Sequence, residues 1–507
     1  MQRRVAFFLM FVFAYFQNYF IIMGQNNTKR INIYFITIVI TLGGLLFGFD
    51  TGVINGTQFY FSKYFELTGW LKGFIVSSAL LGALLGAASA GVISKAIGRK
   101  KSLIWAAILF SISAWGSGLP SFLPESISLM VFFRLIGGVA IGMASMNAPM
   151  YIAEISPADK RGTLVTYYQM AVVIGFFVVF LTTYFIGNGL SEQENIDIGW
   201  RYMFWSELVP ALAFLFLLFM VPQSPRWLMI KGREEEAKDI LVRIHGQEMA
   251  DQEFVDIKES IESEGKQKKA SIFQKSLFPI VIIGTVLSIL QQFTGINAVL
   301  YYGADIFEQA LGFGKEDILA QQILLATVNL LFTFIAMFTV DKLGRKPLLI
   351  IGGFGMLVGF LMMGFTLYLS DYSQVNSAGL PTINSTEGII SLIGILLFIG
   401  SFAMSMGPIV WVLLSEIFPN KIRSTAMAIA VAAQWLANYF VSQTFPIVVE
   451  SDSNRLIMDG GTWNNSLPYF IFSGFIVIII LFVWKFIPET KGRTLEEMET
   501  IFNKKKS

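Results

Sequence analysis

The stretch "SEIFPNKIRS" at residues 415–424 repeats the pattern of an earlier stretch, "AEISPADKRG" at residues 153–162. A second pair, "AIGRK" at 96–100 and "KLGRK" at 342–346, recurs in the same order. Each of these motifs lies between apolar segments, and a long polar segment separates the first members from the second. We infer that the chain consists of two related halves.

Apolar residues dominate both halves. The chain has 507 residues, of which 54% are hydrophobic, 14% are charged and 48 are Phe, and its mean hydropathy is +0.63. This composition is far from that of a soluble globular protein. About twelve apolar stretches are long enough, at about 20 residues, to cross a bilayer as helices. They lie near 35–57, 71–94, 102–119, 127–150, 163–187, 200–221, 277–300, 319–340, 347–369, 389–414, 425–448 and 467–487.

The sequence therefore predicts an all-α protein of the lipid bilayer, with about six membrane-spanning helices in each half. Two related halves with corresponding motifs are typical of a transporter that alternates its access around a central site. A net charge of +2 gives no signal for nucleic-acid binding, and the chain has no Cys. The single His245 lies in a charged loop. We find no nucleophile motif, metal cluster or phosphate loop, and we expect neither an enzyme nor a bound metal or cofactor.

Lys and Arg in the loops orient the chain, because they accumulate on the cytoplasmic side. Basic or mixed loops such as "SKAIGRKK" (94–101) and "DKLGRKP" (341–347) alternate with loops that lack Lys and Arg, such as "LSEQENID" (190–197). With twelve spans, this pattern predicts a plasma-membrane protein with both termini in the cytoplasm. The predicted parts are an N-terminal extension (1–32), an N-terminal six-helix half (33–222), a cytoplasmic helical linker (223–275), a C-terminal six-helix half (276–488) and a cytoplasmic tail (489–507).

The first 22 residues, "MQRRVAFFLMFVFAYFQNYFII", have a positive start and an apolar core, as a signal peptide or an extra span would. Either would invert every later loop, so we favour Met23 as the natural start. In the linker, Glu234 and Lys238 are predicted to pair along one helix, and Phe254, Ile257 and Ile261 form an apolar stripe.

Several long motifs, in order, resemble those of the sugar porter family of the major facilitator superfamily. They are "PQSPRWL" (222–228), "QQFTGINAVLYY" (291–302), "VDKLGRKP" (340–347), "GPIVWVLLSEIFPNKIRS" (407–424) and "PETKGRTLEEME" (488–499). The resemblance covers essentially residues 33 to 500 and implies the major facilitator fold. "AMSMGPIVWVLLSEIFPN" with "AIAVAAQWLANYFVS" is most similar to the proton-coupled pentose symporters of the family. Two features depart from the family pattern: Ser94 and Lys95 replace a frequent acidic residue, and Gln223 replaces the usual Glu.

Side-chain amides are costly in apolar spans unless they have a partner, yet they can both donate to and accept from sugar hydroxyls without burying a charge. Some of them could instead bridge helices. The resemblance implies sugar contacts for the amides, with aromatic and apolar faces beside them, and Gly295 would loosen its helix so that neighbouring amides face one cavity. These residues are Gln169, Gln291, Gln292, Asn297, Asn329 and Gln434, with Phe47, Tyr301, Gly407, Trp411 and Trp435. Trp435 could also be an interfacial or packing residue.

Charged residues near the loops match, by resemblance, a cytoplasmic gate that closes the inside in the outward-open state. They are Arg99, Glu154, Arg161, Glu207, Arg226, Arg345, Glu416 and Arg423. The positive-inside rule alone would explain neighbouring Lys residues, but it does not require acids such as Glu154 and Glu416. Ion pairing does.

Asp50 lies in the apolar stretch "LLFGFDTGVING" (45–56), where a carboxylate costs roughly 2.5–3.5 kcal/mol on insertion scales. Gly residues recur every four positions at 44, 48, 52 and 56 and predict a face for close helix contact, with Asp50 pointing away from it into the cavity. Its predicted partner is Arg134, another lone charge within a span, although a static ion pair is also consistent with the pattern.

Facilitative relatives usually have a neutral residue at the position of Asp50, so the resemblance implies proton coupling, with Glu207 as the next candidate. We expect a monomeric symporter of a monosaccharide and a proton. The alternatives are a facilitative uniporter and a non-transporting sugar sensor. Xylose, glucose, galactose and arabinose all fit this pattern.

Overall fold

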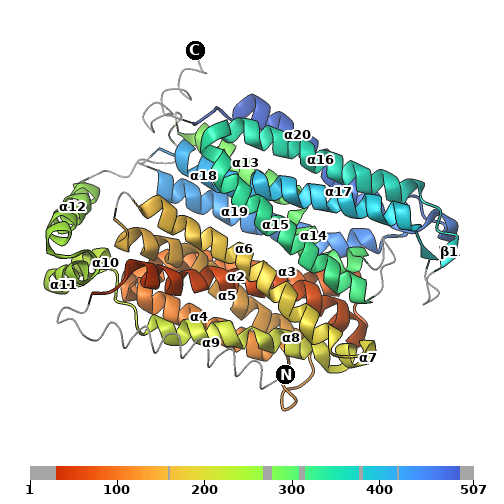
Figure 1. Cartoon of the computed structure of the whole chain (residues 1–507), viewed down its shortest axis with the longest axis horizontal. Helices are drawn as coiled ribbons and strands as arrows, with labels where there is room; N and C mark the ends of the chain where they lie inside the picture. The colour runs from red at the N-terminus through yellow and green to blue at the C-terminus, as the bar shows by residue number, and fades with distance from the viewer. Residues whose placement is uncertain are drawn as a thin grey trace.

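In a computed structural model, the described residues are 30–157, 160–266, 274, 277–307, 315–375, 381–419 and 422–491. The predicted start at Met23, most of the N-terminal extension and most of the C-terminal tail lie outside these residues. Figure 1 shows the helices in two groups that lie side by side with roughly parallel axes. We call α2 to α9 the N-terminal bundle and α13 to α20 the C-terminal bundle.

The N-terminal bundle contains five long helices and one broken one. The long helices are α2 (Ile33–Tyr64), α3 (Gly69–Ile97), α4 (Arg99–Ser117), α5 (Ile127–Ile155) and α6 (Arg161–Asn188). The broken one comprises α7 (Glu192–Glu194), the π-helical turn η1 (Asn195–Gly199), α8 (Trp200–Ser206) and α9 (Leu208–Leu218). Glu207 lies at the junction of α8 and α9.

Three linker helices follow, α10 (Pro225–Ile230), α11 (Glu234–His245) and α12 (Gln247–Lys266), and they lie at one end of the bundles. We call this the linker end and the opposite end the far end. The predicted stripe of Phe254, Ile257 and Ile261 packs on the buried side chains of α10 and α11, which confirms it.

The predicted pair of Glu234 and Lys238 is wrong. Glu234 instead pairs with Lys258 at 3.3 Å, and Lys238 pairs with Asp251 at 2.8 Å, so both ion pairs join α11 to α12. His245 is the last residue of α11 rather than part of a loop; its side chain is 4% exposed, and burial lowers its pKa. Its ring lies 3.1 Å from the carbonyl oxygen of Ile155, at the end of α5.

The C-terminal bundle comprises α13 (Phe278–Phe293), α14 (Ile296–Asp305), α15 (Lys315–Leu343), α16 (Arg345–Leu369), α17 (Ser385–Met404), α18 (Met406–Ile417), α19 (Arg423–Val449) and α20 (Leu467–Phe486). At the far end, the short strands β1 (Gln374–Val375) and β2 (Pro381–Thr382) pair antiparallel. Two 3-10 turns, η3 (Asp452–Asn454) and η4 (Ile457–Asp459), connect α19 to α20.

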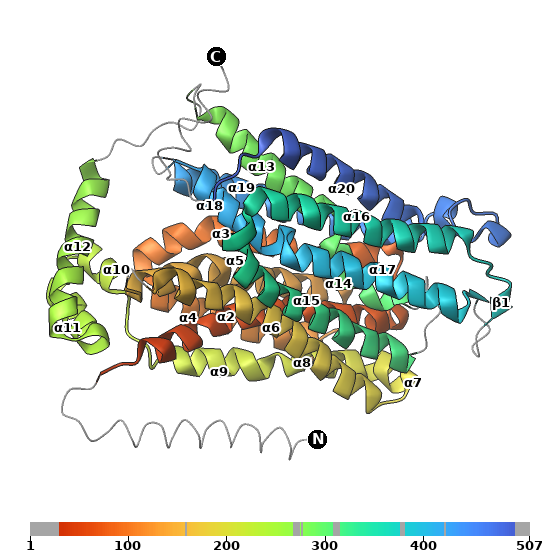
Figure 2. The ribbon, with the colours of Figure 1, turned by 45° about the horizontal axis from the view of Figure 1, so that its top comes forward.

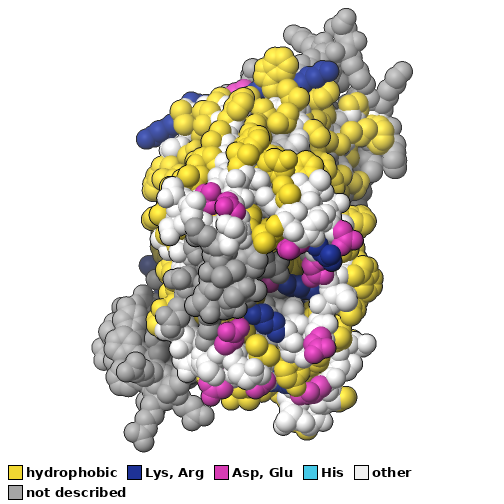
Figure 3. Space-filling model, turned by 90° about the vertical axis from the view of Figure 1, so that its right-hand side faces the viewer, with side chains coloured by type: hydrophobic (Ala, Val, Ile, Leu, Met, Phe, Trp, Pro, Cys, Tyr) yellow, Lys and Arg dark blue, Asp and Glu magenta, His cyan; other side chains and the backbone are white. Residues whose placement is uncertain are grey.

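Ten segments among the described residues are long and apolar enough to cross a membrane. The other two predicted spans are α4, which begins with Arg-Lys-Lys, and α19, which has several buried amides and hydroxyls. Hydrophobic side chains cover the flanks of the molecule, whereas charged side chains gather on the face of its far end (Figure 3). The all-α membrane fold with twelve helices is confirmed.

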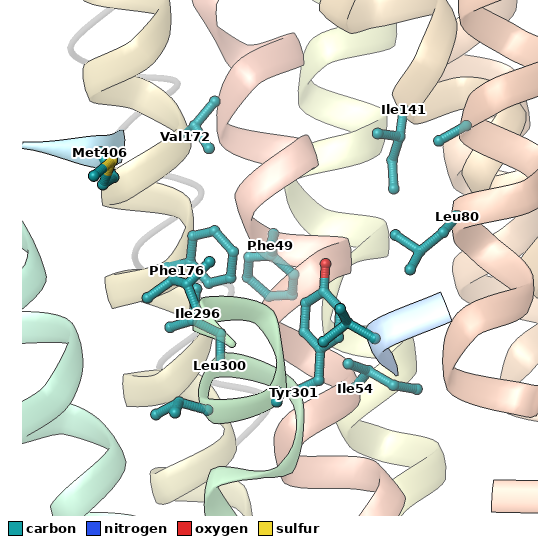
Figure 4. Packing of buried hydrophobic residues seen from close by; sticks show 14 of the residues in the cluster. Phe49, Ile54, Leu80, Ile141, Val172, Phe176, Ile296, Leu300, Tyr301 and Met406 are labelled. Atoms are coloured by element: carbon teal, nitrogen blue, oxygen red, sulfur yellow. The ribbon is translucent and has the colours of Figure 1, made fainter. Parts of the chain in front are cut away.

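The predicted glycine face of α2 packs against α6. A Cβ added at Gly48 would lie 2.0 Å from the carbonyl oxygen of Val172, so only glycine allows this approach. Across the bundles, α2 contacts α14, α3 contacts α19, and α6 contacts α15. Figure 2 shows these helices in the middle of the molecule, and Figure 4 shows Tyr301 of α14 beside Phe49 and Ile54 of α2.

Candidate functional site

The predicted partner of Asp50 is confirmed. Arg134 of α5 donates to Oδ1 of Asp50, and both side chains are buried, with Asp50 at 0% exposure. Gly137 leaves room for this carboxylate, because a Cβ there would lie 3.3 Å from Oδ2 of Asp50. Asp50 points away from the glycine face, as predicted, but into the contact between α2 and α5 rather than into an open cavity.

Glu207 belongs to the same buried cluster. It is 1% exposed, and neither of its carboxylate oxygens has a hydrogen-bond partner among the described residues. Its carboxyl group lies within electrostatic range of Asp50 and Arg134. The expectation that Glu207 belongs to the gate at the linker end is therefore wrong, because the broken helix α8–α9 places it deep inside the N-terminal bundle.

Four of the predicted amides form one hydrogen-bonded network in the C-terminal bundle. Gln291 is its hub: its Oε1 accepts from Nε2 of Gln434 at 2.7 Å and from Nε2 of Gln292 at 3.3 Å. Its own Nε2 donates to the carbonyl oxygen of Met406 at 2.6 Å. Asn297 donates to Oε1 of Gln292 at 2.5 Å. Oε1 of Gln434 is buried and has no partner among the described residues, so the network has capacity for another donor.

The predicted break at Gly295 is confirmed. Its φ of +90° lies in the left-handed region, so α13 ends at Phe293 and α14 begins at Ile296. Because of this break, Gln292 before it and Asn297 after it can share a hydrogen bond, although they are five residues apart. The backbone therefore brings the amides of two short helices into one cluster.

Two further predicted residues, one from each bundle, form an aromatic contact beside this cluster. The rings of Phe47 of α2 and Trp435 of α19 have centroids 5.7 Å apart, which gives an aromatic contact next to Gln434. Tyr301 accepts from Asn438, a buried amide that the sequence analysis missed, at 3.3 Å.

The remaining predicted residues of this group take no part in the hydrogen bonds described for the network. Gln169 on α6 and Asn329 on α15 are half-buried, as is Gly407 at the start of α18, and Trp411 is 37% exposed. Their role in binding stays a prediction.

At the linker end, each bundle contains an ion pair from the repeated motifs. Arg99 pairs with Glu154 at 2.7 Å in the N-terminal bundle. Arg345 pairs with Glu416 at 2.8 Å in the C-terminal bundle. Both pairs therefore lie within a bundle and not between the bundles.

The repeat extends to residues that the sequence comparison of the halves did not align. Oε1 of Gln223 accepts from the backbone N–H of Lys100 at 3.0 Å, at the start of α4. Glu489 accepts from the N–H groups of Arg345 and Lys346 at 3.0 and 3.1 Å, at the start of α16. Likewise, Ser224 donates to Glu154, and Thr490 donates to Glu416.

The other predicted gate residues contact neighbouring backbone or the linker. Arg161 donates to the carbonyl oxygen of Ser156 at 3.3 Å. Arg423 donates to that of Phe418 at 3.1 Å. Arg226, on α10, donates to Ser260 of α12 at 3.2 Å, which places it in the linker.

Gln223→Glu is expected to stabilise the N-terminal bundle, because a carboxylate at the start of α4 gains from the helix dipole and from charge-assisted bonds. A gain of about 0.5–1 kcal/mol would raise the unfolding temperature by about 1–3 °C. The reciprocal variant Glu489→Gln should lower it. Burial raises the pKa of Glu489, but backbone N–H donors more than offset this, so its pKa lies below the ordinary value.

The measurement is thermal unfolding of the purified protein against pH. Because the pKa of Glu489 is lowered, its stabilising effect is full above the unfolded pKa, about 4.5, and disappears as the pH falls through the folded value. The difference between wild type and Glu489→Gln should shrink in the same range. An unchanged unfolding temperature in both variants would contradict the equivalence of these two caps.

At the far end, hydrogen bonds join the bundles instead. Asn55 of α2 donates to the carbonyl oxygen of Leu300 at 2.9 Å and accepts from the N–H of Ala304 at 3.0 Å. Gln443 of α19 accepts from Ser77 of α3 at 3.0 Å. The sequence analysis missed these residues, although Asn55 lies in the apolar stretch that contains Asp50.

Two bundles of membrane-spanning helices, each with buried polar groups in its interior, are the architecture of a secondary transporter. The chain belongs to the family described as "Sugar (and other) transporter", whose model matches residues 36–502. It is 44% identical to the D-xylose-proton symporter of Escherichia coli (strain K12), covering 93% of this chain and 96% of that protein. It is 41% identical to the glucose transport protein of Synechocystis sp., with 91% and 95% covered.

Among solved structures, the chain is similar to a partially occluded, inward-open conformation of the xylose transporter XylE from E. coli. The TM-score is 0.76 at 41% identity, and the match covers 90% of this chain and 100% of that one. The chain is thus a multi-pass membrane transporter and not an enzyme.

Proposed function

We propose that this protein imports a monosaccharide together with a proton by alternating access. The observation that carries the coupling is the buried Asp50–Arg134 pair with Glu207 beside it. Two carboxyl groups and one guanidinium share a site without water access, so one of the acids has no full countercharge there. Such a site favours uptake of a proton.

The sugar would bind at the amide network. Gln291, Gln292, Asn297 and Gln434 provide donors and acceptors without charge, as sugar hydroxyls require. The ring contact of Phe47 and Trp435 provides an apolar face for the C–H side of a sugar. Relatives that are named for xylose and glucose transport support this class of substrate.

Helix α2 links the two sites. Phe47 and Asp50 lie about one turn apart on it, so Phe47 approaches the amide network while Asp50 pairs with Arg134. A proton on Asp50 would release Arg134, which then has Glu207 and the ring of Phe204, at 5.9 Å, as neighbours. A shift of α2 would then move Phe47 relative to the amide network, where the sugar would bind.

The distribution of contacts supports a conformation that is open to the linker end. The ion pairs at the linker end lie within the bundles, whereas the far end has hydrogen bonds between them. Because basic residues accumulate at the linker end, we infer that it is cytoplasmic, that both termini are too, and that the protein is a monomer in the plasma membrane.

The test uses purified protein in liposomes. Counterflow with labelled xylose, glucose, galactose and arabinose identifies the sugar, and sugar-induced alkalinisation outside the vesicles reports proton entry. One charge moved down 100 mV is worth about 2.3 kcal/mol, or roughly 50-fold accumulation. Counterflow without proton movement would favour the facilitative uniporter, in which Asp50 and Arg134 form a static pair.

A further inference from the structure

A buried ion pair joins the two bundles at the far end. Nζ of Lys72, on α3, lies 2.6 Å from Oδ2 of Asp305, the last residue of α14. Gln58 of α2 donates to the same oxygen at 2.8 Å. Lys72 is 7% exposed and Asp305 is 6% exposed. Two residues of the N-terminal bundle therefore hold one carboxylate of the C-terminal bundle.

The short helix α14 connects this ion pair to the amide network. It begins directly after the break at Gly295, and its backbone departs from helical geometry again at Tyr302. Asn297 of the network lies near its start, and Asp305 forms its end. Between these two residues, Asn55 of α2 forms hydrogen bonds with two backbone groups of α14. The position of Asp305 therefore affects where α14 presents Asn297.

Separation of the bundles at the far end must break this pair, because its partners belong to different bundles. A buried ion pair contributes little net stability, since desolvation offsets the attraction between the charges. Loss of one partner is different, because it leaves an uncompensated charge in the closed state. When the bundles separate, water solvates that charge.

We propose that Lys72, Asp305 and Gln58 form the outer latch of the transport cycle, which sets the population of the outward-closed state and positions α14 for the sugar. The proposal rests on the proposed function, because a latch matters only in a protein that alternates its access. Lys72 and Asp305 are thus positioning residues for transport and not part of the amide network.

The test measures the opening of the far end directly. The chain has no native Cys, so Ser121→Cys and Ser453→Cys, at exposed positions in far-end connections of the two bundles, take one spin label each. The distance distribution gives the ratio of outward-open to outward-closed protein. Lys72→Met and Asp305→Asn should each raise this ratio by about tenfold or more, because each leaves one buried charge unpaired. The double variant should return to within about threefold of wild type.

The matched control is Lys63→Met. Lys63 pairs with Glu192 at 3.3 Å at the same end, but both residues belong to the N-terminal bundle and are exposed. It should leave the ratio unchanged. If a single variant does not fold, Asp305→Glu provides a second comparison, since it keeps the charge pair and should resemble wild type.

Sugar binding gives a second measurement. In both single variants, the apparent affinity for outside sugar should change together with the open population, and the double variant should reverse both. Equal ratios in wild type, single and double variants would overturn the latch. The distance measurement needs neither sugar nor a proton gradient, so absence of sugar-induced alkalinisation in wild type would overturn the proposed function and leave the latch result readable.

Discussion

Asp50→Asn is expected to abolish uphill accumulation of sugar, reducing it from the roughly 50-fold that a 100 mV potential allows to equal concentrations on both sides. Asparagine keeps the size and hydrogen-bonding capacity of aspartate but cannot carry a proton. The amide network belongs to the other bundle, so sugar binding should survive. The measurement is accumulation of labelled sugar in vesicles under a 100 mV membrane potential, negative inside, together with sugar-induced alkalinisation.

Asp50→Asn also leaves Arg134 without its ion-pair partner, and Glu207 is the remaining acid beside Arg134. Glu207→Gln is therefore the matched control, because it removes the neighbouring acid and keeps the Asp50–Arg134 pair. It should preserve some coupling. If Asp50→Asn still accumulates sugar and Glu207→Gln does not, Glu207 and not Asp50 carries the proton.

Gln291→Ala is expected to weaken sugar binding more than any other single change in the amide network. Gln291 accepts from Gln292 and Gln434 and donates to the carbonyl oxygen of Met406, so its removal leaves several buried groups without a partner. At about 1–3 kcal/mol for each unsatisfied group, the dissociation constant should rise by at least about tenfold. The measurement is a binding isotherm with purified protein.

Asn297→Ala and Gln292→Ala should have smaller effects, because the Asn297 side chain makes one hydrogen bond in the network and that of Gln292 makes two, whereas that of Gln291 makes three. Gln169→Ala is a useful comparison, since the hydrogen bonds described for the network do not include Gln169. A wild-type isotherm for Gln291→Ala would exclude the network as the sugar site. A large effect of Gln169→Ala would show that the predicted site extends to α6.

The sequence predicted the features that depend on a residue and its near neighbours along the chain. Gly48 and its repeats identified the face that packs on α6, and Gly295 identified the break before α14. Asp50 and Arg134 could be paired because each is a lone charge in an apolar span, and such charges need a partner.

The sequence did not predict contacts whose partners are far apart. Asn55 and Leu300 are 245 residues apart, and hydrophobic periodicity reports burial without identifying the partner. Lys72 lies at the start of the predicted span 71–94 and Asp305 lies just after the predicted span 277–300, and neither position indicates a partner. The resemblance gave Glu207 two expected roles, in the gate and as the next proton site. Its buried position beside Asp50 depends on the broken helix α8–α9, which the apolar pattern of the last N-terminal span does not reveal.

The linker helices are fastened to the N-terminal bundle by more than the chain itself. The indole N–H of Trp227 donates to the carbonyl oxygen of Lys95 at 3.1 Å, and the N–H of Ile31 donates to that of Arg243 at 2.8 Å. With His245 against Ile155, these bonds attach α10 and α11 to that bundle at three points. For electron microscopy, a membrane protein of this size offers few features for particle alignment outside the detergent micelle. An antibody fragment raised against α11 and α12 would provide such a feature, and its tilt in each image would report the orientation of the N-terminal bundle.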